Sequence, residues 1–345
     1  MLIIPANTVP VGAENDNLQG SRMSIGSIVG RALVAVAALT LSGAAVAQSA
    51  ANWPDRPVKI VLNFAPGGGI DNGMRPFTEP LQRALGQPFV LEHKGGASGA
   101  IGVEAGTKAT PNGYTFFATP GLTLAILPNV RTTPYDPFKD MTPVSYFTWY
   151  PMMLTVHPSV PVNNLKELVA YGKANPAKLS LGSSGIASTG HLVVEGFNKA
   201  AGLSILHVPY RGSSDAMNDF LAGVVQVFAD PTIAPHIKAG KAKLLAVTGD
   251  RHPEYPDVPT FGETYPEADF VGWNGLFAPV GTPEPIIRKL NETMSMIAKT
   301  PEVAALLLRV GQFPHAGTPE DLGAILRKDH ARYGKLTREL NIRVD

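Results

Sequence analysis

The chain contains no cysteine, and this absence alone excludes several kinds of chemistry. Without thiols there is no disulfide, no thiolate nucleophile, no iron–sulfur cluster and no cysteine-ligated zinc. A lipoprotein anchor is excluded too, because its lipid is attached to a cysteine. If the chain is exported, it therefore needs no oxidative folding machinery.

Charge is also scarce. Only 17% of the residues are charged and the formal net charge is +1, so no basic field exists to drive nucleic-acid binding. Hydrophobic residues make up 44% of the chain, which is enough for a core and excludes intrinsic disorder. The 35 glycines and 31 prolines stay below the share typical of low-complexity chains. A length of 345 residues suggests roughly two domains.

The common catalytic motifs are missing as well. The eight histidines include no H-x-x-x-H pair, and H-E-x-x-H, G-x-S-x-G and P-loop sequences do not occur. Gly67-Gly68-Gly69 begins like a dinucleotide-binding loop, but Asn72 stands where the last glycine is required. These absences argue against an enzyme, and we expect no cofactor and no metal.

The N-terminal region has the three parts of a secretory signal peptide. Arg31 precedes the sixteen uncharged residues 32–47, which end in Ala45-Val46-Ala47 before Gln48. A membrane anchor is the alternative, but the run is rich in alanine and short of the ~20 residues that a spanning helix needs. We expect export and cleavage after Ala47. Residues 1–22 resemble neither a signal nor a folded segment, so Met23 is a candidate start.

Short strands alternate with helices along the rest of the chain, which predicts parallel α/β sheets in two lobes. Pro80 is expected to kink the first helix, which Gly86 ends. The expected strands are 59–64, 89–92, 114–118, 152–156, 179–181, 205–208, 225–228 and 244–247, with 269–278 extended. Two expected helices follow the first two strands and end at residues 85 and about 109. The other expected helices are 164–174, 190–201, 214–222, 284–300, 301–310 and 319–341.

Two loops rich in glycine or serine each leave a predicted strand and open a helix: residues 65–71 and 182–189. This arrangement presents unpaired backbone N–H groups and the positive end of a helix dipole to an anion. The hydroxyls of Ser183, Ser184, Ser188 and Thr189 add donors. Neither loop is basic, so the expected guest is a small carboxylate. Ordinary strand–helix connection is the alternative for each loop.

Several side chains near these loops allow two interpretations. Asp71 is either a helix N-cap or a ligand contact and loop organiser. His191 is either a structural donor or a ligand contact, and Asp230 either accepts from a ligand or fixes its own loop. Arg211 either clamps a second carboxylate or is solvated. Three aromatic residues fit core packing better than a ligand platform: Trp149, Tyr150 and Trp273.

A series of motifs runs through the chain from residue 53 onward. They are WPDRP at 53–57, FAPGGGID at 64–71, LGQP at 85–88, PNGYT at 111–115, PYDP at 134–137, GSSG at 182–185, HL at 191–192, HVPYRG at 207–212, PHIKAGK at 235–241, PDVPT at 256–260, WNGLFAP at 273–279 and GTP at 281–283. In this order they resemble the periplasmic solute-binding proteins of tripartite tricarboxylate transporters, the Bug/TctC family. Pro76 and Pro80 depart from the pattern of this family, as do Gly69 and Ile70.

The resemblance implies a type II periplasmic-binding-protein fold: two α/β lobes joined by two crossover segments, with a ligand cleft between them. Residues 1–47 would be the N-terminal extension and signal peptide, 53–153 plus 272–345 lobe 1, and 154–271 lobe 2, with crossovers near 154–158 and 271–278. The expected protein is a periplasmic monomer with no nucleic-acid partner. It would deliver its ligand to the membrane subunits of a transporter.

The resemblance also implies that loops 64–71 and 183–189 pinch one carboxylate of a di- or tricarboxylate, acidic amino acid or aromatic carboxylate. An exported sensor that signals to a membrane sensor kinase is the alternative, and an exported hydrolase comes third. Arg211 is the candidate contact for a second carboxylate. The implied ligand contacts are Phe64, Gly68, Gly69, Ile70, Asp71, Thr119, Ser183, Ser184, Ser188, Thr189, His191, Tyr210 and Asp230.

Overall fold

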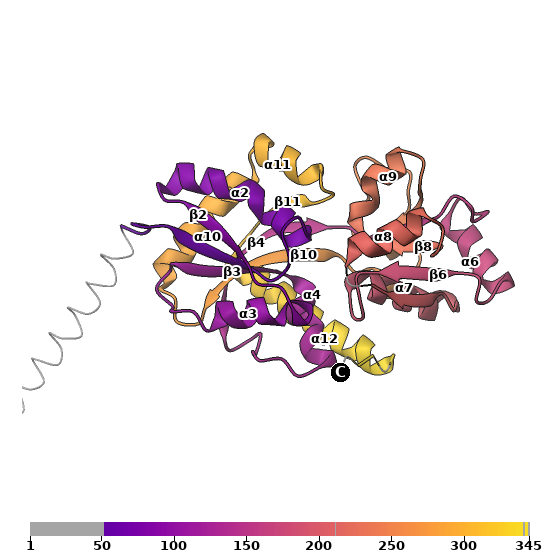
Figure 1. The fold of residues 1–345 in the computed structure, drawn as a ribbon, viewed down its shortest axis with the longest axis horizontal. Coiled ribbons are helices and arrows are strands. Elements are labelled where there is room, and N and C mark those ends of the chain that lie inside the picture. The colour runs from indigo at the N-terminus through magenta and orange to yellow at the C-terminus, as the bar shows by residue number, and fades with distance from the viewer. Residues whose placement is uncertain (1–51, 211, 341, 344–345) are drawn as a thin grey trace, which may run out of the picture. The chain divides into compact units, whose positions relative to one another are not determined.

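The computed structural model describes residues 52–210, 212–340 and 342–343, and the chain from Ala50 onward forms one compact unit. Two mixed sheets flanked by helices make up this unit (Figure 1). The predicted signal peptide, its cleavage site and Arg211 lie outside the described residues. Within the described ranges, no helix has the length and apolar character needed to cross a membrane.

The first sheet has the strand order β11-β4-β10-β3-β1-β2. Strands β1 (Val58–Leu62), β2 (Phe89–His93) and β3 (Thr115–Pro120) run parallel, and Ile60 of β1 pairs with Leu91 and Phe116. Strands β4 (Met141–Tyr150), β10 (Gly272–Pro279) and β11 (Phe313–Gly317) are antiparallel to their neighbours. Strand β1 is buried except at Lys59, because its apolar side chains face helices on both sides of the sheet.

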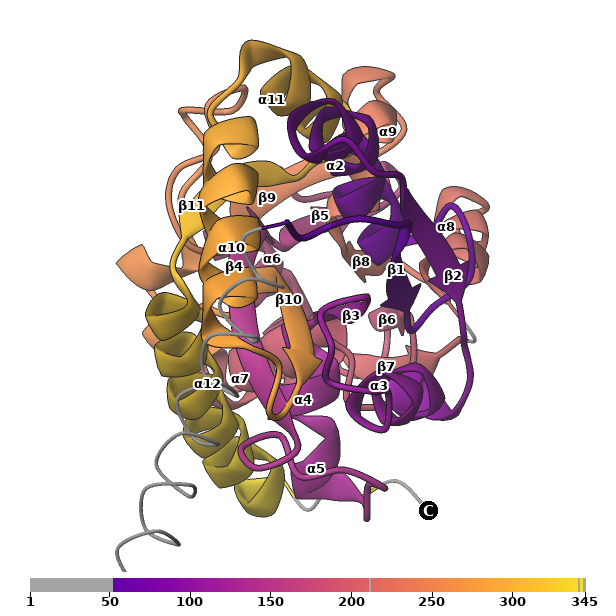
Figure 2. The same ribbon diagram turned by 90° about the vertical axis from the view of Figure 1, so that its left-hand side faces the viewer.

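Helices cover both faces of this sheet. On one face, α2 (Gly69–Leu85), α10 (Glu284–Ala298) and α11 (Pro301–Leu308) share a core with Ile60 and Phe116. On the other, α3 (Ala100–Thr107), α4 (Gly121–Ala125), α5 (Leu127–Val130) and α12 (Pro319–Glu339) pack in the core of Phe117. Figure 2 shows α10 and α12 beside β4.

The second sheet has the order β7-β6-β8-β5-β9. Strands β6 (Ser180–Ser183), β7 (Leu206–Pro209) and β8 (Val227–Ala229) are parallel, whereas β5 (Met153–Val156) is antiparallel to β8 and β9 (Lys243–Val247). Its helices are α6 (Leu165–Ala174), α7 (Thr189–Ala201), α8 (Ser213–Leu221) and α9 (Ala234–Lys238). Short 3-10 turns cover Ala97–Gly99, Pro231–Ile233, Phe261–Glu263 and Pro266–Ala268.

The mixed α/β class with two sheets is confirmed, but the expectation of parallel sheets is only partly right. Strands β4 and β11 were not expected from the sequence, and both run antiparallel to their neighbours. Each contains a proline, which usually argues against a strand inside a sheet. The sheet accommodates Pro143 at a register shift, where Phe277 pairs with Pro143 and Leu276 with Ser145.

The chain passes twice between the two sheets. The chain leaves β4 at Tyr150 and enters β5 at Met153, and it returns between Val247 and Gly272. The predicted segments 154–158 and 271–278 are largely strand, because the buried β5 and β10 pair with neighbours on both sides. Helix α2 continues through Pro76 and Pro80 to Leu85 and ends, as predicted, at a left-handed Gly86.

Candidate functional site

The two predicted loops connect corresponding elements. We call residues 64–71 loop 1 and residues 183–189 loop 2. Loop 1 follows β1 and enters α2, whose N-cap is Gly68; loop 2 follows β6 and enters α7, whose N-cap is Ser188. Each helix therefore begins at the end of a short loop that follows a buried strand, and its first N–H groups have no helical partners.

Asp71 is the centre of loop 1. Its buried carboxylate accepts from the Gly67 backbone N–H at 2.9 Å, from Arg75 Nη2 at 2.6 Å and from His93 Nε2 at 2.9 Å. Burial opposes ionisation, but these hydrogen bonds outweigh it and lower the pKa of Asp71. The N-cap interpretation is wrong, because Gly68 holds that position and Asp71 is the third helical residue. The structure gives Asp71 the role of loop organiser.

Asn63 is a polar residue that the sequence reasoning missed. It lies directly after β1, is 1% exposed, and its Nδ2 donates to Thr119 Oγ1 at 2.9 Å and Thr123 Oγ1 at 3.1 Å. These bonds join the ends of β1 and β3, and they occupy the hydroxyl of the predicted contact Thr119. The signal for this role was a lone amide side chain closing the apolar run KIVLN.

Loop 2 is folded by its own side chains. Ser188 Oγ caps α7 by accepting from His191 N at 3.3 Å. Ser183 Oγ accepts from Gly185 N at 3.2 Å and lies 3.0 Å from the Gly185 carbonyl oxygen and 2.6 Å from His207 Nε2. Gly185 has φ 135° and Ala187 has φ 61°, so the backbone of the loop is in conformations that need this support.

Two histidines stand behind loop 2. His191 Nδ1 accepts from the Ala187 N–H at 3.0 Å, and its ring stacks on that of His207 with centroids 3.7 Å apart and planes at 14°. Burial, with the charge of His207 as a smaller cause, lowers the pKa of His191 to about 3, and burial lowers the pKa of His207 to about 4. Both rings are therefore neutral at pH 7.

The remaining predicted contacts are mostly engaged within the protein. Asp230 accepts from Ser213 Oγ at 2.7 Å and from the N–H and hydroxyl of Thr232, which supports the interpretation that it fixes its own loop. The hydroxyl of Tyr210 donates to Asp219 at 2.7 Å, and burial raises the pKa of Tyr210 to about 12.

The other predicted contacts differ in which of their atoms are available to a ligand. Ile70 is buried in the core, so only its backbone is available, and Phe64 packs at the edge of the same core. Gly69 is exposed, and a Cβ there would meet nothing within 4 Å. The hydroxyls of Ser184 and Thr189 make no hydrogen bond to another described residue.

The three aromatic residues pack, in line with the packing interpretation. Trp273 lies over Gly121 and its Nε1 donates to the buried Asp329 at 2.7 Å. Trp149 stacks on Phe313 with ring centroids 4.6 Å apart. Tyr150 covers Gly272, where a Cβ would collide with the Tyr150 ring.

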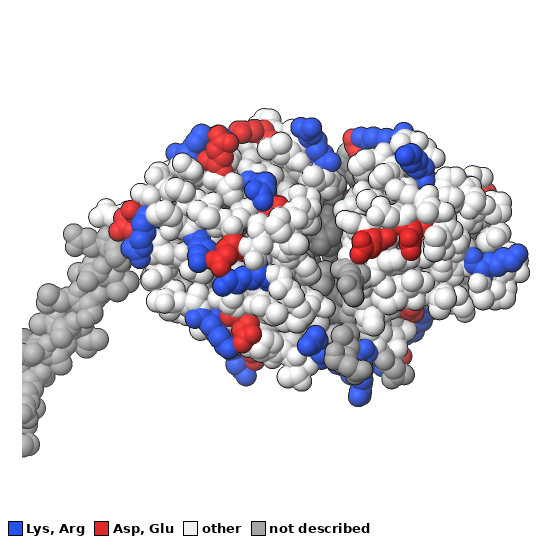
Figure 3. Space-filling view, viewed as in Figure 1, with Lys and Arg blue, Asp and Glu red and all other residues white. Residues whose placement is uncertain are grey.

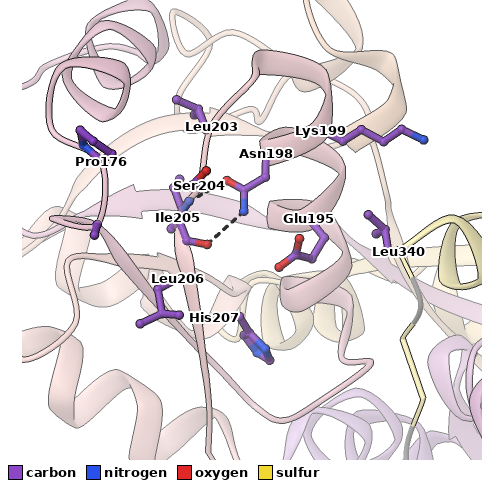
Figure 4. A pocket seen from close by; sticks show the side chains of 11 residues that line it. Pro176, Glu195, Asn198, Lys199, Leu203, Ser204, Ile205, Leu206, His207 and Leu340 are labelled. Atoms are coloured by element: carbon purple, nitrogen blue, oxygen red, sulfur yellow. Dashed lines mark hydrogen bonds between the residues drawn. The ribbon is translucent and has the colours of Figure 1, made fainter.

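A hollow of about 730 Å³ lies on the outer side of α7 and β7 (Figure 4). It is lined by apolar side chains such as Leu203 and Leu206 together with Glu195 and His207. Asn198 holds the backbone N–H and carbonyl of Ile205 through two hydrogen bonds of 3.0 Å, which occupies part of the free edge beside β7. His207, which contacts Ser183 of loop 2, lines this hollow, but no residue of loop 1 or loop 2 does. A second, of about 460 Å³, lies between α5 and the end of α12.

The described surface offers little to a metal or a polyanion. No three His, Asp or Glu side chains within the described ranges lie close enough together to hold a metal ion. On the face shown in Figure 3, basic and acidic side chains are interspersed. The donors of loops 1 and 2 are thus neutral backbone and hydroxyl groups, which suit a small carboxylate better than a phosphate chain.

Residues 74–342 match the family model described as "Tripartite tricarboxylate transporter family receptor". The chain belongs to this receptor family. The resemblance inferred from the motifs is thereby confirmed, and the family comprises periplasmic binding proteins. BugT of Bordetella pertussis is 32% identical over 310 residues, which cover 87% of this chain and 94% of BugT.

Two solved structures of similar receptors carry carboxylates in their names. The structure "R. palustris Rpa4515 with adipate" is 32% identical, with a TM-score of 0.77, and the match covers 84% of this chain and 99% of that chain. MatC from Rhodopseudomonas palustris, with bound malate, is 29% identical with a TM-score of 0.73, covering 82% of this chain and 99% of that chain.

Proposed function

We propose that this receptor captures a small carboxylate in the periplasm, holds it between loop 1 and loop 2, and delivers it unchanged to the membrane subunits of a tripartite tricarboxylate transporter. Similar receptors that hold adipate and malate support the ligand class. The family model supports the transporter as partner. Signalling to a sensor kinase stays the alternative from the sequence.

The observation that carries the proposal is that some polar groups of the loops are bonded within the protein, whereas others stay available to a ligand. Asp71, Ser183 and Ser188 each accept a hydrogen bond from a backbone N–H in or next to their own loop. These bonds fix the positions of the remaining donors. Those donors are the first N–H groups of α2 and α7 and the hydroxyls of Ser184 and Thr189. Two helix N-termini and two hydroxyls form a neutral, preorganised receptor for one carboxylate.

The surroundings of Ser183 support binding without turnover. Among the contacts of the two loops, the one that most resembles a nucleophile–base pair is that of 2.6 Å between Ser183 Oγ and His207 Nε2. However, Ser183 is 3% exposed and its hydroxyl is already engaged with Gly185, so a substrate carbonyl cannot reach it. A group buried in this way serves the shape of the loop.

A thermal-shift screen tests the proposal. Purified protein should be heated with adipate, malate, glutamate and benzoate, each beside its amide. We expect at least one acid to raise Tm by mass action while its amide does so much less, since the neutral group gains less from helix N-termini. Chromatography should recover that acid unchanged. Equal shifts with acid and amide, or formation of a product, would contradict the proposal.

A further inference from the structure

Two histidine rings hold opposite ends of loop 2. At the start of the loop, Ser183 Oγ lies 2.6 Å from His207 Nε2; near its end, the Ala187 N–H donates to His191 Nδ1 at 3.0 Å. The rings stack on each other at 3.7 Å and are nearly parallel. The two ends of the loop are thus tied to one rigid aromatic unit, whose two rings come from α7 and from β7.

The hydrogen bonds determine where the protons are. Because His191 Nδ1 accepts an N–H, the neutral ring carries its proton on Nε2, which faces Glu195 Oε1 at 3.7 Å. A protonated His191 would set a ring N–H against the N–H of Ala187. Ala187 has φ 61°, which is costly for a residue with a side chain, so its conformation depends on this bond.

The pairing of strand β6 with β7 and the start of α7 explain why the two histidine rings lie side by side. Strands β6 and β7 pair in parallel with Leu181 opposite His207 and Ser183 opposite Pro209. Residues two apart on neighbouring strands share one face of the sheet, so the side chain of His207 lies on the face from which Ser183 projects. His191 comes from the first turn of α7, which begins where loop 2 ends.

We propose that the stacked pair of His191 and His207 is the brace that positions loop 2 for its ligand, and that His207 is a positioning residue acting through Ser183. The brace itself is a property of the free protein. Only its effect on ligand affinity rests on the proposed function.

Glu195 and Lys199 of α7 are charged side chains that line the hollow beside the pair. Glu195 on α7 faces His191, and burial raises the pKa of Glu195. Lys199 on the same helix is paired with Glu339 of α12 at 2.6 Å. In the hollow beside β7, Glu195, Lys199 and His207 are the titratable side chains (Figure 4). The pair therefore remains neutral until acid charges it, and charging breaks the bond to Ala187.

Three variants separate bracing from simple packing. His207→Phe keeps an aromatic face for stacking but cannot bond Ser183, whereas His207→Gln keeps an amide near the position of Nε2. His157→Gln is the matched control, because His157 follows β5, which is separated from β7 by β6 and β8 in the sheet, and its ring bonds Ser159. Circular dichroism and urea unfolding establish that each variant is folded.

Amide hydrogen exchange of the free protein is the deciding measurement. We expect His207→Phe to reduce the protection of Gly185 and Ala187 by about three- to tenfold, as loss of one hydrogen bond implies, with His207→Gln and His157→Gln close to the wild type. In the wild type, the protection factor of Ala187 should fall as the pH drops from about 6.5 toward about 3, the ordinary and the folded-state pKa of His191. Unchanged protection in His207→Phe at pH 7 would overturn the proposal.

Affinity for malate and adipate, measured by calorimetry, gives the second readout. His207→Phe should weaken whichever of the two binds by about three- to tenfold, and His207→Gln should restore most of it. If the wild type binds neither acid, the proposed function fails in this form, while the exchange data still decide whether the brace exists. If a ligand binds all variants equally, the brace does not position loop 2 for it.

Discussion

Removing the carboxylate of Asp71 should loosen loop 1, because this one group ties together three donors. Asp71→Ala leaves the Gly67 N–H, the Arg75 guanidinium and the His93 ring without their acceptor. The side chain of Asp71 is 2% exposed, so water cannot simply take its place. The change acts on the turn that leads into α2 and leaves the helix sequence after it intact.

The magnitude can be worked from the exposure of each partner. Arg75 is 58% exposed, so its pairing contributes no more than about 1 kcal/mol. The Gly67 N–H bonds a buried, charged acceptor, an interaction in the range of about 1.5–3 kcal/mol. We expect Asp71→Ala to lower the free energy of unfolding by about 2–4 kcal/mol. Asp71→Asn, which keeps an acceptor for Gly67, should lose less.

Urea unfolding followed by circular dichroism measures this loss. Glu79→Ala is the control on the same helix, since Glu79 is 78% exposed and pairs only with exposed side chains; it should change stability by less than about 0.5 kcal/mol. The reasoning is refuted if Asp71→Ala is as stable as this control. It is also refuted if the variant binds a confirmed ligand with unchanged affinity.

Three further predictions concern acid, a buried charge and the N-terminus. The folded-state pKa values of His191 and His207, about 3 and about 4, lie below the ordinary 6.5, so the unfolded chain binds more protons. Stability should therefore fall between pH 6.5 and about pH 4, by up to about 1.4 kcal/mol per pH unit for each histidine, and His207→Gln should show a shallower slope in urea unfolding. Burial raises the pKa of Asp329, so Asp329→Asn should keep or raise Tm at pH 7; a marked fall would show that the charge is needed. N-terminal sequencing of periplasmic protein should begin at Gln48, and an intact 32–47 segment in the membrane fraction would contradict cleavage.

The elements that the sequence predicted well are those with clear local signals. Asn164 caps α6 at the start of the expected helix 164–174, and Gly86 ends α2 as expected, because capping depends on one residue and its immediate neighbours. Strand β4 escaped prediction because Pro143 and several polar residues interrupt its apolar run. Its stability comes from pairing with β10 and β11, whose residues lie more than a hundred positions away in the chain.

The two loops were predictable as strand–loop–helix connections, but the contacts of the side chains within them were not, and their role as a ligand site stays a prediction. Strand–loop–helix patterns with glycine and serine indicated both loops correctly. That Asp71 bonds His93 and that Ser183 bonds His207 depends on strand register across 22 and 24 residues, which no local pattern states. In the sequence, His207 stood out only as part of the motif HVPYRG. It lies two residues before Pro209, which pairs with Ser183, and this spacing was the signal that could have indicated its role.

Calorimetric titration of the acid found in the thermal-shift screen tests the central claim most directly. With wild type as reference, Ser184→Ala should bind about ten- to a hundredfold more weakly, because one hydrogen bond to a charged group contributes about 1.5–3 kcal/mol. Gly68→Val should bind more weakly still, since a Cβ there meets the Ala65 carbonyl oxygen at 3.2 Å and its branches cover the N-terminus of α2. The exposed Ser159→Ala should bind like the wild type. Near-native affinity in both loop variants, with folding intact, would contradict a carboxylate held between loop 1 and loop 2.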